Sequence, residues 1–531
     1  MIKSKIINYL RKIIKEDIGI EVFVPENEQF GHYSTNAALK LAKGLKKSPI
    51  EIAEEIKSKL EKQLDMLGLI KETKVVSPGF INFWLKPEFF QNELKEILRK
   101  KERYGKSQIA NRKSQKIQIE FISANPTGPL TLANGRGGFL GNALSNILEF
   151  YGHKIEREYY INDTGNQILT LGKSILANAG LLKPEESFYK GEYVKEWAQK
   201  NLKLVKKYKD KPLKVGQTTA ADFLKEIKLV VKKAKINFDR WTSEEKHIHK
   251  KSFVKKALKI FESEKLVYKK DGALWLKTTQ FGDDKDRVLI TSDGFPTYFL
   301  ADAGHYLETK TRGFDAKINI LGPDHFGYVN RIQAAAKIIG LKNSKIIVTQ
   351  VVRLISKGKE AKMSKRKGEF VTFEDLIKEV GLDVARFFFL MYSPDTHMNF
   401  DLDLAKERSL KNPVYYVQYA AVRARSILGK IKNQKSKINF ELLNTKEDIN
   451  LMRMLARFPE IIEEAAGSYS PQILARYSLD LAREFHNFYE KERIIGEEKN
   501  LTLSRLALIQ ATLLIFKNIF NLLGISLPKK M

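Results

Sequence analysis

A strand-like segment that leads directly into a glycine-rich loop and a helix constrains this chain more than any other feature. Residues 116–123, KIQIEFIS, alternate apolar and polar side chains, which predicts a β-strand. The loop ANPTGPLTLANGRGG follows, and the predicted helix after it extends to about Tyr151. Further strand candidates, RVLIT, KINIL and KIIVTQVV, alternate with helical segments, and this order predicts a parallel sheet.

The pattern on either side of this region differs and divides the chain into domains. Residues 1–95 mix helical periodicity with short strands, and residues 96–115 form a basic, polar stretch typical of a linker. We expect an α/β domain over 116–405, interrupted by a lysine-rich helical insertion at about 170–235. Strand signals stop near residue 406, so 406–531 is predicted to be a separate all-helical domain.

The composition narrows the class of protein. The chain has 93 basic and 63 acidic residues, a formal charge of +30, and such a surplus attracts polyanions. A lysine-rich composition without any nucleic-acid partner is the alternative. No cysteine is present, which excludes disulfides and cysteine-ligated zinc. The most apolar stretch, LALIQATLLIFKNIFNLLGISL, is broken by Lys517, Asn518 and Asn521, so no membrane span is expected.

Two segments are suited to a nucleotide. Glycines in the loop allow close approach to a ligand, and the start of the following helix offers free N–H groups to phosphate. The dinucleotide motif GxGxxG is absent, which disfavours a nicotinamide enzyme. The second segment, AKMSKRKGE at 361–369, concentrates four cations that suit a triphosphate. For the glycine-rich loop the alternative is an ordinary tight turn, and for AKMSKRKGE it is a solvated surface loop.

These two segments resemble the signature motifs of class I aminoacyl-tRNA synthetases. KMSKR at 362–366 is similar to the KMSKS loop, and SANPTGPLTLANGRGG is similar to the arginyl-enzyme form of the HIGH motif. FGHYSTNAALKLAK and SPGFINFWL resemble the N-terminal domain of arginyl enzymes, and YYINDTGNQI, GDDKDRVL and GPDHFGYVNR resemble their catalytic domain. NPVYYVQYAAVRARSIL is similar to the start of their helical anticodon domain. The resemblance implies a Rossmann-like catalytic domain between an N-terminal α+β domain and a C-terminal anticodon-binding bundle of the DALR type.

The resemblance also assigns an ATP site. It places Thr131, Asn134, Lys362 and Lys365 in catalysis. It places these further residues around ATP: Pro126, Thr127, Gly128, Pro129, Leu130, Leu132, Ala133, Gly135, Arg136, Asp324, His325, Met363 and Ser364. The two histidines of the HIGH motif fall here on Thr131 and Asn134. Because a hydroxyl and an amide can still donate hydrogen bonds, we expect an active enzyme with an altered site.

A binding site for arginine requires acidic side chains, because a guanidinium group pairs best with a planar carboxylate. Glu120 ends the predicted strand, and Asp302 lies four residues after Tyr298, so the latter two share one helix face. The family uses acidic and tyrosyl groups at these positions. The resemblance adds Asn125 and Ser123 as contacts to arginine.

Candidate contacts to tRNA lie in the two outer domains. An aromatic run on one predicted helix carries Tyr415, Gln418, Tyr419 and Arg423, and rings of this kind stack on unpaired bases. Packing inside the helical bundle is the alternative for such a run. Asn82 resembles a position associated with the D-loop of tRNA.

The resemblance therefore implies an arginine–tRNA ligase that activates arginine with ATP and Mg²⁺ and transfers it to the 3′ end of tRNA in protein synthesis. The resemblance implies a cytoplasmic monomer without a bound structural metal. Three alternatives stay open: a non-enzymatic RNA-binding relative, another class I synthetase or adenylate-forming ligase, and a generic basic nucleic-acid binder.

Overall fold

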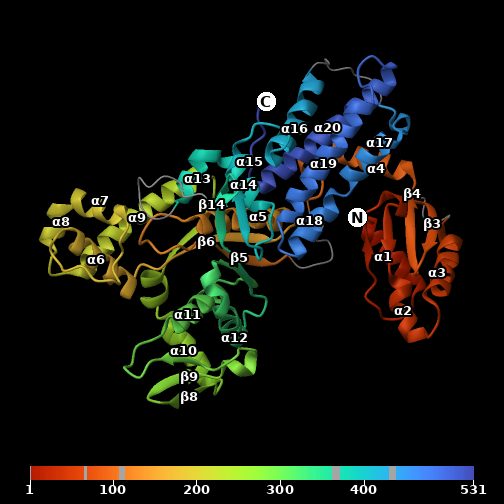
Figure 1. Cartoon of the computed structure of the whole chain (residues 1–531). Coiled ribbons are helices and arrows are strands. Elements are labelled where there is room, and N and C mark those ends of the chain that lie inside the picture. The colour runs from red at the N-terminus through yellow and green to blue at the C-terminus, as the bar shows by residue number, and fades with distance from the viewer. Residues whose placement is uncertain (1, 65–68, 107–113, 361–370, 430–437) are drawn as a thin grey trace.

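The computed structural model describes residues 2–64, 69–106, 114–360, 371–429 and 438–531. Figure 1 shows an elongated arrangement in which the N-terminal domain and a helical insertion lie at opposite ends. A parallel sheet lies between them, and the C-terminal helices stand above this sheet.

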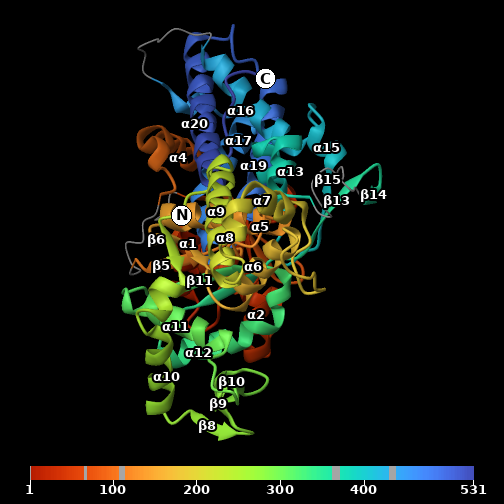
Figure 2. The same ribbon diagram turned by 90° about the vertical axis from the view of Figure 1, so that its left-hand side faces the viewer.

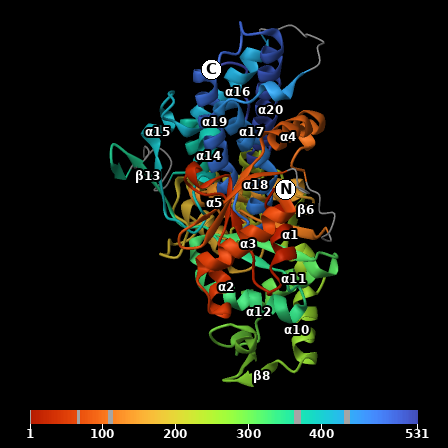
Figure 3. The same cartoon turned by 90° about the vertical axis from the view of Figure 1, so that its right-hand side faces the viewer.

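The N-terminal domain combines three helices with a four-stranded antiparallel sheet of order β1-β2-β4-β3. Its elements are α1 (Ile2–Ile13), β1 (Val22–Phe23), β2 (Tyr33–Thr35), α2 (Ala37–Leu45), α3 (Pro49–Leu64), β3 (Ile70–Val76) and β4 (Phe80–Leu85). Helix α1 buries Ile2, Ile6 and Leu10, which recur every four residues along one face. Figure 3 shows this domain from the side of the molecule on which it lies.

Helix α4 (Pro87–Lys100) corrects part of the expected linker. Residues 96–100 were expected in a polar connection, but they form the last turns of this helix. It packs on α17 and α20 of the C-terminal domain, so a boundary at residue 95 would cut a continuous helix. The buried side chains Phe90, Leu94 and Ile97 explain why the charged segment stays helical.

The central α/β region is built on a five-stranded sheet of order β12-β11-β5-β6-β7, and every neighbouring pair in it is parallel. The strands are β5 (Lys116–Glu120), β6 (Lys154–Ile161), β7 (Arg240–Ser243), β11 (Ala316–Leu321) and β12 (Lys345–Val348). Helix α5 (Leu132–Phe150) connects β5 to β6. The parallel sheet predicted from the strand–helix alternation is thus confirmed, as is the Rossmann-like domain that the resemblance implied.

One predicted member of this sheet lies elsewhere. RVLIT forms β10 (Arg287–Ile290), which pairs antiparallel with β9 (Ala273–Leu276) in a separate sheet completed by β8 (Val267–Lys270). The prediction of a parallel strand was wrong because an apolar run does not reveal its pairing partner. Helices α10 (Phe253–Ser263), α11 (Tyr298–Thr311) and α12 (Val329–Ile339) pack beside this small sheet in the lower part of Figure 1.

The helical insertion consists of α6 (Asn166–Asn178), α7 (Glu192–Lys200), α8 (Leu202–Lys207) and α9 (Pro212–Lys233). It has a core of its own, to which Ile168, Leu171, Val194 and Val215 contribute. Figure 2 looks onto this insertion in front of the α/β domain. The far end of α9 joins the main core through Val231.

The chain then passes through β13 (Val352–Ser356), β14 (Lys359–Glu360), α13 (Phe373–Val380), α14 (Leu382–Leu390), β15 (Met398–Asp401) and α15 (Leu402–Lys406). The C-terminal bundle follows with α16 (Pro413–Gly429), α17 (Lys446–Ala456), α18 (Phe458–Gly467), α19 (Gln472–Lys491) and α20 (Lys499–Leu523). Among the described residues, α20 alone is long and apolar enough to cross a membrane, but 83% of its most apolar stretch is buried inside the protein. We therefore interpret it as the core helix of the bundle.

Candidate active site

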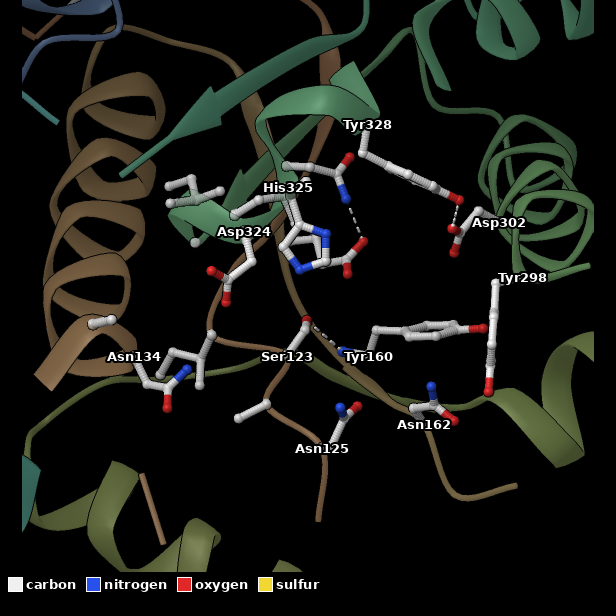
Figure 4. Close-up of a pocket in the computed structure, with 18 of the residues that line it drawn as sticks. Ser123, Asn125, Asn134, Tyr160, Asn162, Tyr298, Asp302, Asp324, His325 and Tyr328 are labelled. Carbon is white, nitrogen blue, oxygen red and sulfur yellow. Dashed lines mark hydrogen bonds between the residues drawn. The ribbon is translucent and has the colours of Figure 1, made fainter. Parts of the chain in front are cut away.

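A cavity of about 720 Å³ opens at the carboxyl ends of β5, β6 and β11. The strand order reverses between β5 and β11, which is the place where open parallel sheets bind ligands. Many of the expected site residues line it (Figure 4). They are Glu120, Ser123, Asn125, Thr127, Gly128, Pro129, Thr131, Ala133, Asn134, Tyr298, Asp302, Asp324 and His325.

The backbone after β5 adopts a strained conformation that turns the loop into the cavity. Ile122 and Ser123 have φ angles of +64° and +39°, which L-residues rarely adopt, and Ile122 is β-branched as well. Neighbouring groups hold this turn, since the N–H of Tyr160 donates to Ser123 Oγ at 3.0 Å. The hydroxyl of Tyr159 donates to the carbonyl of Ala124 at 2.8 Å. Strain held in this way is typical of a functional site.

The two residues that replace the HIGH histidines cap helix α5. Thr131 Oγ1 accepts from the N–H of Asn134, and Asn134 Oδ1 accepts from the N–H of Thr131 at 2.9 Å. The hydroxyl of Thr131 also donates to Asn134 Oδ1 at 2.9 Å. The cap therefore uses the hydroxyl proton of Thr131 and leaves the Nδ2 group of Asn134 as the side-chain donor for the cavity.

Five of the expected ATP contacts do not line the cavity: Pro126, Leu130, Leu132, Gly135 and Arg136. Leu130 is buried in the core, and Gly135 faces the ring of Phe373, which a Cβ atom at this position would approach to 2.2 Å. Arg136 is 2% exposed, and its guanidinium donates to the carbonyls of Gln350, Ser393 and Thr396. The packing of α5 therefore accounts for Gly135 and Arg136, which both belong to this helix.

The sheet register places a buried polar network under one end of the cavity. Asn319 lies opposite Glu120 on β11, and Glu158 lies opposite Glu120 on β6. Asn319 Nδ2 donates to Glu120 Oε2 at 2.6 Å, and Lys317 Nζ lies 3.0 Å from the same oxygen. The second oxygen of Glu120 remains for a ligand. A carboxylate fixed in this way suits a cationic group.

Glu120, Glu158 and His305 are the described residues grouped closely enough to hold a metal ion. Lys317 is fully buried among them, and its Nζ lies 3.5 Å from Glu158 Oε2 and 3.3 Å from His305 Nε2. Burial alone would raise the pKa of Glu158, but His305 and Lys317 hold this pKa well below its usual range. The ammonium group supplies the positive charge that a metal would otherwise bring, so the cluster fits a metal poorly.

Asp302 is the second acidic group of this end and lies one helical turn from Tyr298 on α11. Burial raises its pKa to about 7, although a hydrogen bond from the Tyr328 hydroxyl lowers it. Tyr298 is 57% exposed at the cavity wall. Figure 4 shows Tyr298 and Asp302 on the side of the cavity away from Asn134.

The expected catalytic lysines Lys362 and Lys365 lie outside the described residues, as do Met363 and Ser364. The described chain resumes beside the glycine loop. Thr372 pairs with Thr131 in an antiparallel bridge, and the N–H of Phe373 donates to the carbonyl of Leu130 at 2.8 Å.

The expected tRNA contacts fall into two groups. Tyr415 and Tyr419 stack with centroids 6.3 Å apart on the half-buried side of α16, and Arg423 lies over the ring of Tyr419. Gln418 is buried and donates to Asp383 and to the carbonyl of Ser526, and Asn82 is only 2% exposed in β4. These contacts give Gln418 a structural role in the free protein, and the burial of Asn82 keeps its side chain from the surface.

Sequence reasoning missed several residues of the cavity wall. They are Tyr160, Asn162, Gln167, Tyr193, Glu244, Asn319 and Tyr328. One signal was available, because polar residues at alternate positions of the apolar strand KINIL mark a polar face inside the sheet. The remaining residues lie on segments that are far apart in the sequence, and only the fold brings these segments together.

Comparisons with known proteins agree with this geometry. Residues 1–85 match the family described as the arginyl tRNA synthetase N terminal domain, 93–387 match the class I (R) tRNA synthetase catalytic domain, and 417–531 match the DALR anticodon binding domain. The arginine–tRNA ligase of Citrifermentans bemidjiense is 40% identical over 97% of this chain and 95% of that relative. The ligase of Listeria monocytogenes serovar 1/2a is 39% identical over 99% of this chain and 98% of that relative.

A solved structure extends the likeness to the whole fold. The arginyl-tRNA synthetase of Thermus thermophilus superimposes with a TM-score of 0.82 at 22% identity, over 100% of both chains. With full-length relatives near 40% identity and matching domains in the same order, this chain belongs to the arginyl-tRNA synthetase family.

Proposed function

We propose that the cavity joins arginine to ATP and then passes arginine to the 3′ end of tRNA. As an arginine–tRNA ligase of class I, the protein uses ATP for this reaction. The observation that carries the proposal is the meeting of two acidic side chains, Glu120 and Asp302, with the start of helix α5 in one cavity. The acids suit a guanidinium group, and the helix start suits a phosphate chain.

Arginine lies at the acidic end. Glu120, held by Asn319 and Lys317, and Asp302, held by Tyr328, accept from the guanidinium group. Ser123 and Asn125 on the strained loop hold the ammonium and carboxylate groups of the substrate. These contacts leave the carboxylate directed toward the start of α5.

ATP lies along the glycine loop, with Thr127, Gly128, Pro129 and Ala133 against it and with Asp324 and His325 at the exposed mouth of the cavity. The arginine carboxylate attacks the α-phosphorus, the bond to the bridging oxygen breaks, and pyrophosphate leaves. Asn134, Lys362 and Lys365 offset the charge of the leaving group. Mg²⁺ accompanies the ATP phosphates.

The second step uses the tRNA. A terminal ribose hydroxyl attacks the carbonyl carbon of the adenylate, its proton is lost, and AMP leaves. Tyr415, Tyr419 and Arg423 offer a stacking surface to anticodon bases on the 406–531 domain. The 1–95 domain contacts the tRNA elbow. We further propose that the protein acts as a cytoplasmic monomer.

The test is aminoacylation by the purified protein with each amino acid in turn. Only arginine should be joined to tRNA. Pyrophosphate exchange, measured in the presence of tRNA, should depend on arginine. Asp302→Ala should abolish exchange with the fold intact. Asp293→Ala, on the exposed turn before α11 and outside the cavity, serves as the matched control. Unchanged arginine kinetics in Asp302→Ala would remove this cavity from the reaction, and failure to charge any tRNA would favour the RNA-binding alternative.

A further inference from the structure

Two side chains in the cavity wall carry a buried oxygen without a hydrogen-bond partner. They are Asn162, whose Oδ1 is unpaired, and Gln167, whose Oε1 is unpaired. Both follow β6 within six residues, at the entry to helix α6. An unpaired buried polar atom costs free energy, and folded proteins rarely keep one unless a ligand or water satisfies it.

The segment that carries them is held firmly against the cavity. Asp163 accepts from the Ser243 hydroxyl at 2.6 Å and from the N–H of Glu245 at 3.1 Å. Just before it, the ring of Tyr160 stacks on His305 with centroids 4.3 Å apart. The two amides are therefore presented by a fixed segment, which favours preformed recognition.

Their position points to the arginine end of the cavity. A Cβ atom at Gly165, between the two residues, would lie 3.9 Å from the hydroxyl of Tyr298. Figure 4 shows Asn162 beside Tyr160 and Tyr298, across the cavity from Asn134. The phosphate-binding end is thus the more distant one.

The chemistry of arginine explains why further acceptors are needed there. Its guanidinium group has five N–H donors, and its ammonium group adds more. The acidic oxygens are partly in use, because Glu120 Oε2 already accepts from Asn319 and Asp302 Oδ2 accepts from Tyr328. We propose that the carbonyl oxygens of Asn162 and Gln167 accept hydrogen bonds from N–H groups of bound arginine. This inference rests on the assignment of the cavity proposed above.

The test uses substitutions that keep size and separate an accepting from a donating role. Gln167→Met and Asn162→Leu remove both roles, whereas Gln167→Glu and Asn162→Asp keep only the acceptor. We expect the first pair to raise the KM for arginine about tenfold or more, since bonds to a charged group are the stronger kind. The second pair should stay within about threefold of the unaltered protein. Asn178→Leu, at the exposed end of α6, is the matched control.

A stability measurement adds an independent readout. Without arginine, Gln167→Met should unfold at the same temperature as the unaltered protein or higher, because an amide with an unpaired buried oxygen is replaced by an apolar group. The rise in unfolding temperature on adding arginine should be smaller in this variant. This pairing of effects is not expected of a residue that only supports the fold.

Several outcomes would overturn the inference. A raised KM for ATP or for tRNA, with that for arginine unchanged, would assign the amides to a ribose or to the adenine. Equal damage from the acidic and the apolar variants would make the amide nitrogen the contact. No change in any of the four would remove both residues from the site. Each outcome presupposes that the unaltered protein charges tRNA with arginine, so failure of the proposed function is separately visible.

Discussion

Asp302 combines burial with a functional position, and its raised pKa makes arginine binding depend on pH. Its pKa is about 7 in the free fold, against an ordinary value of 3.8. Guanidinium needs the carboxylate, so below about pH 7 binding must expel a proton. We expect the affinity for arginine to fall up to tenfold for each pH unit below about 7 and to level off above it.

Calorimetry of arginine binding in two buffers of different ionisation enthalpy measures this proton directly. Release should be seen at pH 6 and should vanish in Asp302→Asn. The same shift affects stability: the protonated carboxyl stabilises the free fold below pH 3.8, and this contribution is lost as the pH rises through about 7. Equal affinity at pH 6 and pH 8 would contradict the assignment.

Lys317 is the second residue whose removal has a defined consequence. Its buried ammonium group lies 3.0 Å from Glu120 and 3.5 Å from Glu158, so Lys317→Met removes the counter-charge that both carboxylates share. Glu158 keeps Arg240, at 3.7 Å, and His305. Breaking such a buried arrangement costs about 3–5 kcal/mol. We expect a loss of this size in the free energy of unfolding, measured with urea.

The control for Lys317→Met is Lys342→Met, at an exposed position, which should change stability by less than about 0.5 kcal/mol. Adding Glu158→Gln to Lys317→Met should recover part of the loss, because it removes one of the two buried carboxylate charges. A loss below about 1 kcal/mol in Lys317→Met would show that water already screens Lys317 from the two carboxylates.

At the scale of elements, Thr131 and Asn134 at the start of α5 have different roles, although the sequence alone assigns both to catalysis. Thr131 uses its hydroxyl within the cap, whereas Asn134 keeps Nδ2 for the cavity. We expect Thr131→Ala to cost about 0.5–2 kcal/mol of stability with a modest loss of rate. Asn134→Ala should lower kcat about 10²-fold, the effect of losing one transition-state donor.

Pyrophosphate exchange and thermal unfolding, measured on the same preparations, distinguish these two effects. Thr131→Ser, which keeps the cap hydroxyl, is the matched control and should change neither quantity much. If Thr131→Ala and Asn134→Ala show the same loss of exchange rate and the same unfolding temperature, the two residues do not have separate roles.

Sequence patterns predict individual elements of this protein but not which distant elements pair with one another. The strand, glycine loop and helix around residue 128 could be predicted because periodicity and glycine spacing are local signals. Glu120 could be placed at the site because it ends that strand. The antiparallel pairing of β10 and the three carbonyl partners of Arg136 could not, because they depend on which distant segments meet. The unpaired oxygen of Gln167 is invisible for the same reason.

At the scale of the whole molecule, a buried carboxylate joins the N-terminal domain to the C-terminal bundle, in addition to the packing of α4 on α17 and α20. Glu460 on α18 is 4% exposed, accepts from the N–H of Lys3 at 2.7 Å and accepts from the Tyr33 hydroxyl at 2.9 Å. It therefore caps the start of α1 and fixes the sheet of the same domain. This contact is one of those that hold the two outer domains against each other.

If both outer domains grip one tRNA, loosening this contact should weaken tRNA binding while leaving the small substrates unaffected. Glu460→Leu leaves the Tyr33 hydroxyl and the Lys3 N–H without their acceptor, and each such loss costs about 1–3 kcal/mol. We expect the KM for tRNA to rise several-fold and the KM values for ATP and arginine to stay unchanged. Glu497→Leu, at an exposed bend of the same bundle before α20 and away from Lys3, is the matched control.

A deletion tests the same idea more severely, and α4 decides where it must end. Because α4 packs on α17 and α20, removing residues 1–95 would expose the bundle and confuse lost tRNA contacts with lost stability. Removing residues 2–86 keeps the helix whole. This variant should bind tRNA more weakly than Glu460→Leu does and should bind ATP normally. Unchanged tRNA affinity in the deletion would show that the N-terminal domain does not contact tRNA, whatever Glu460 does.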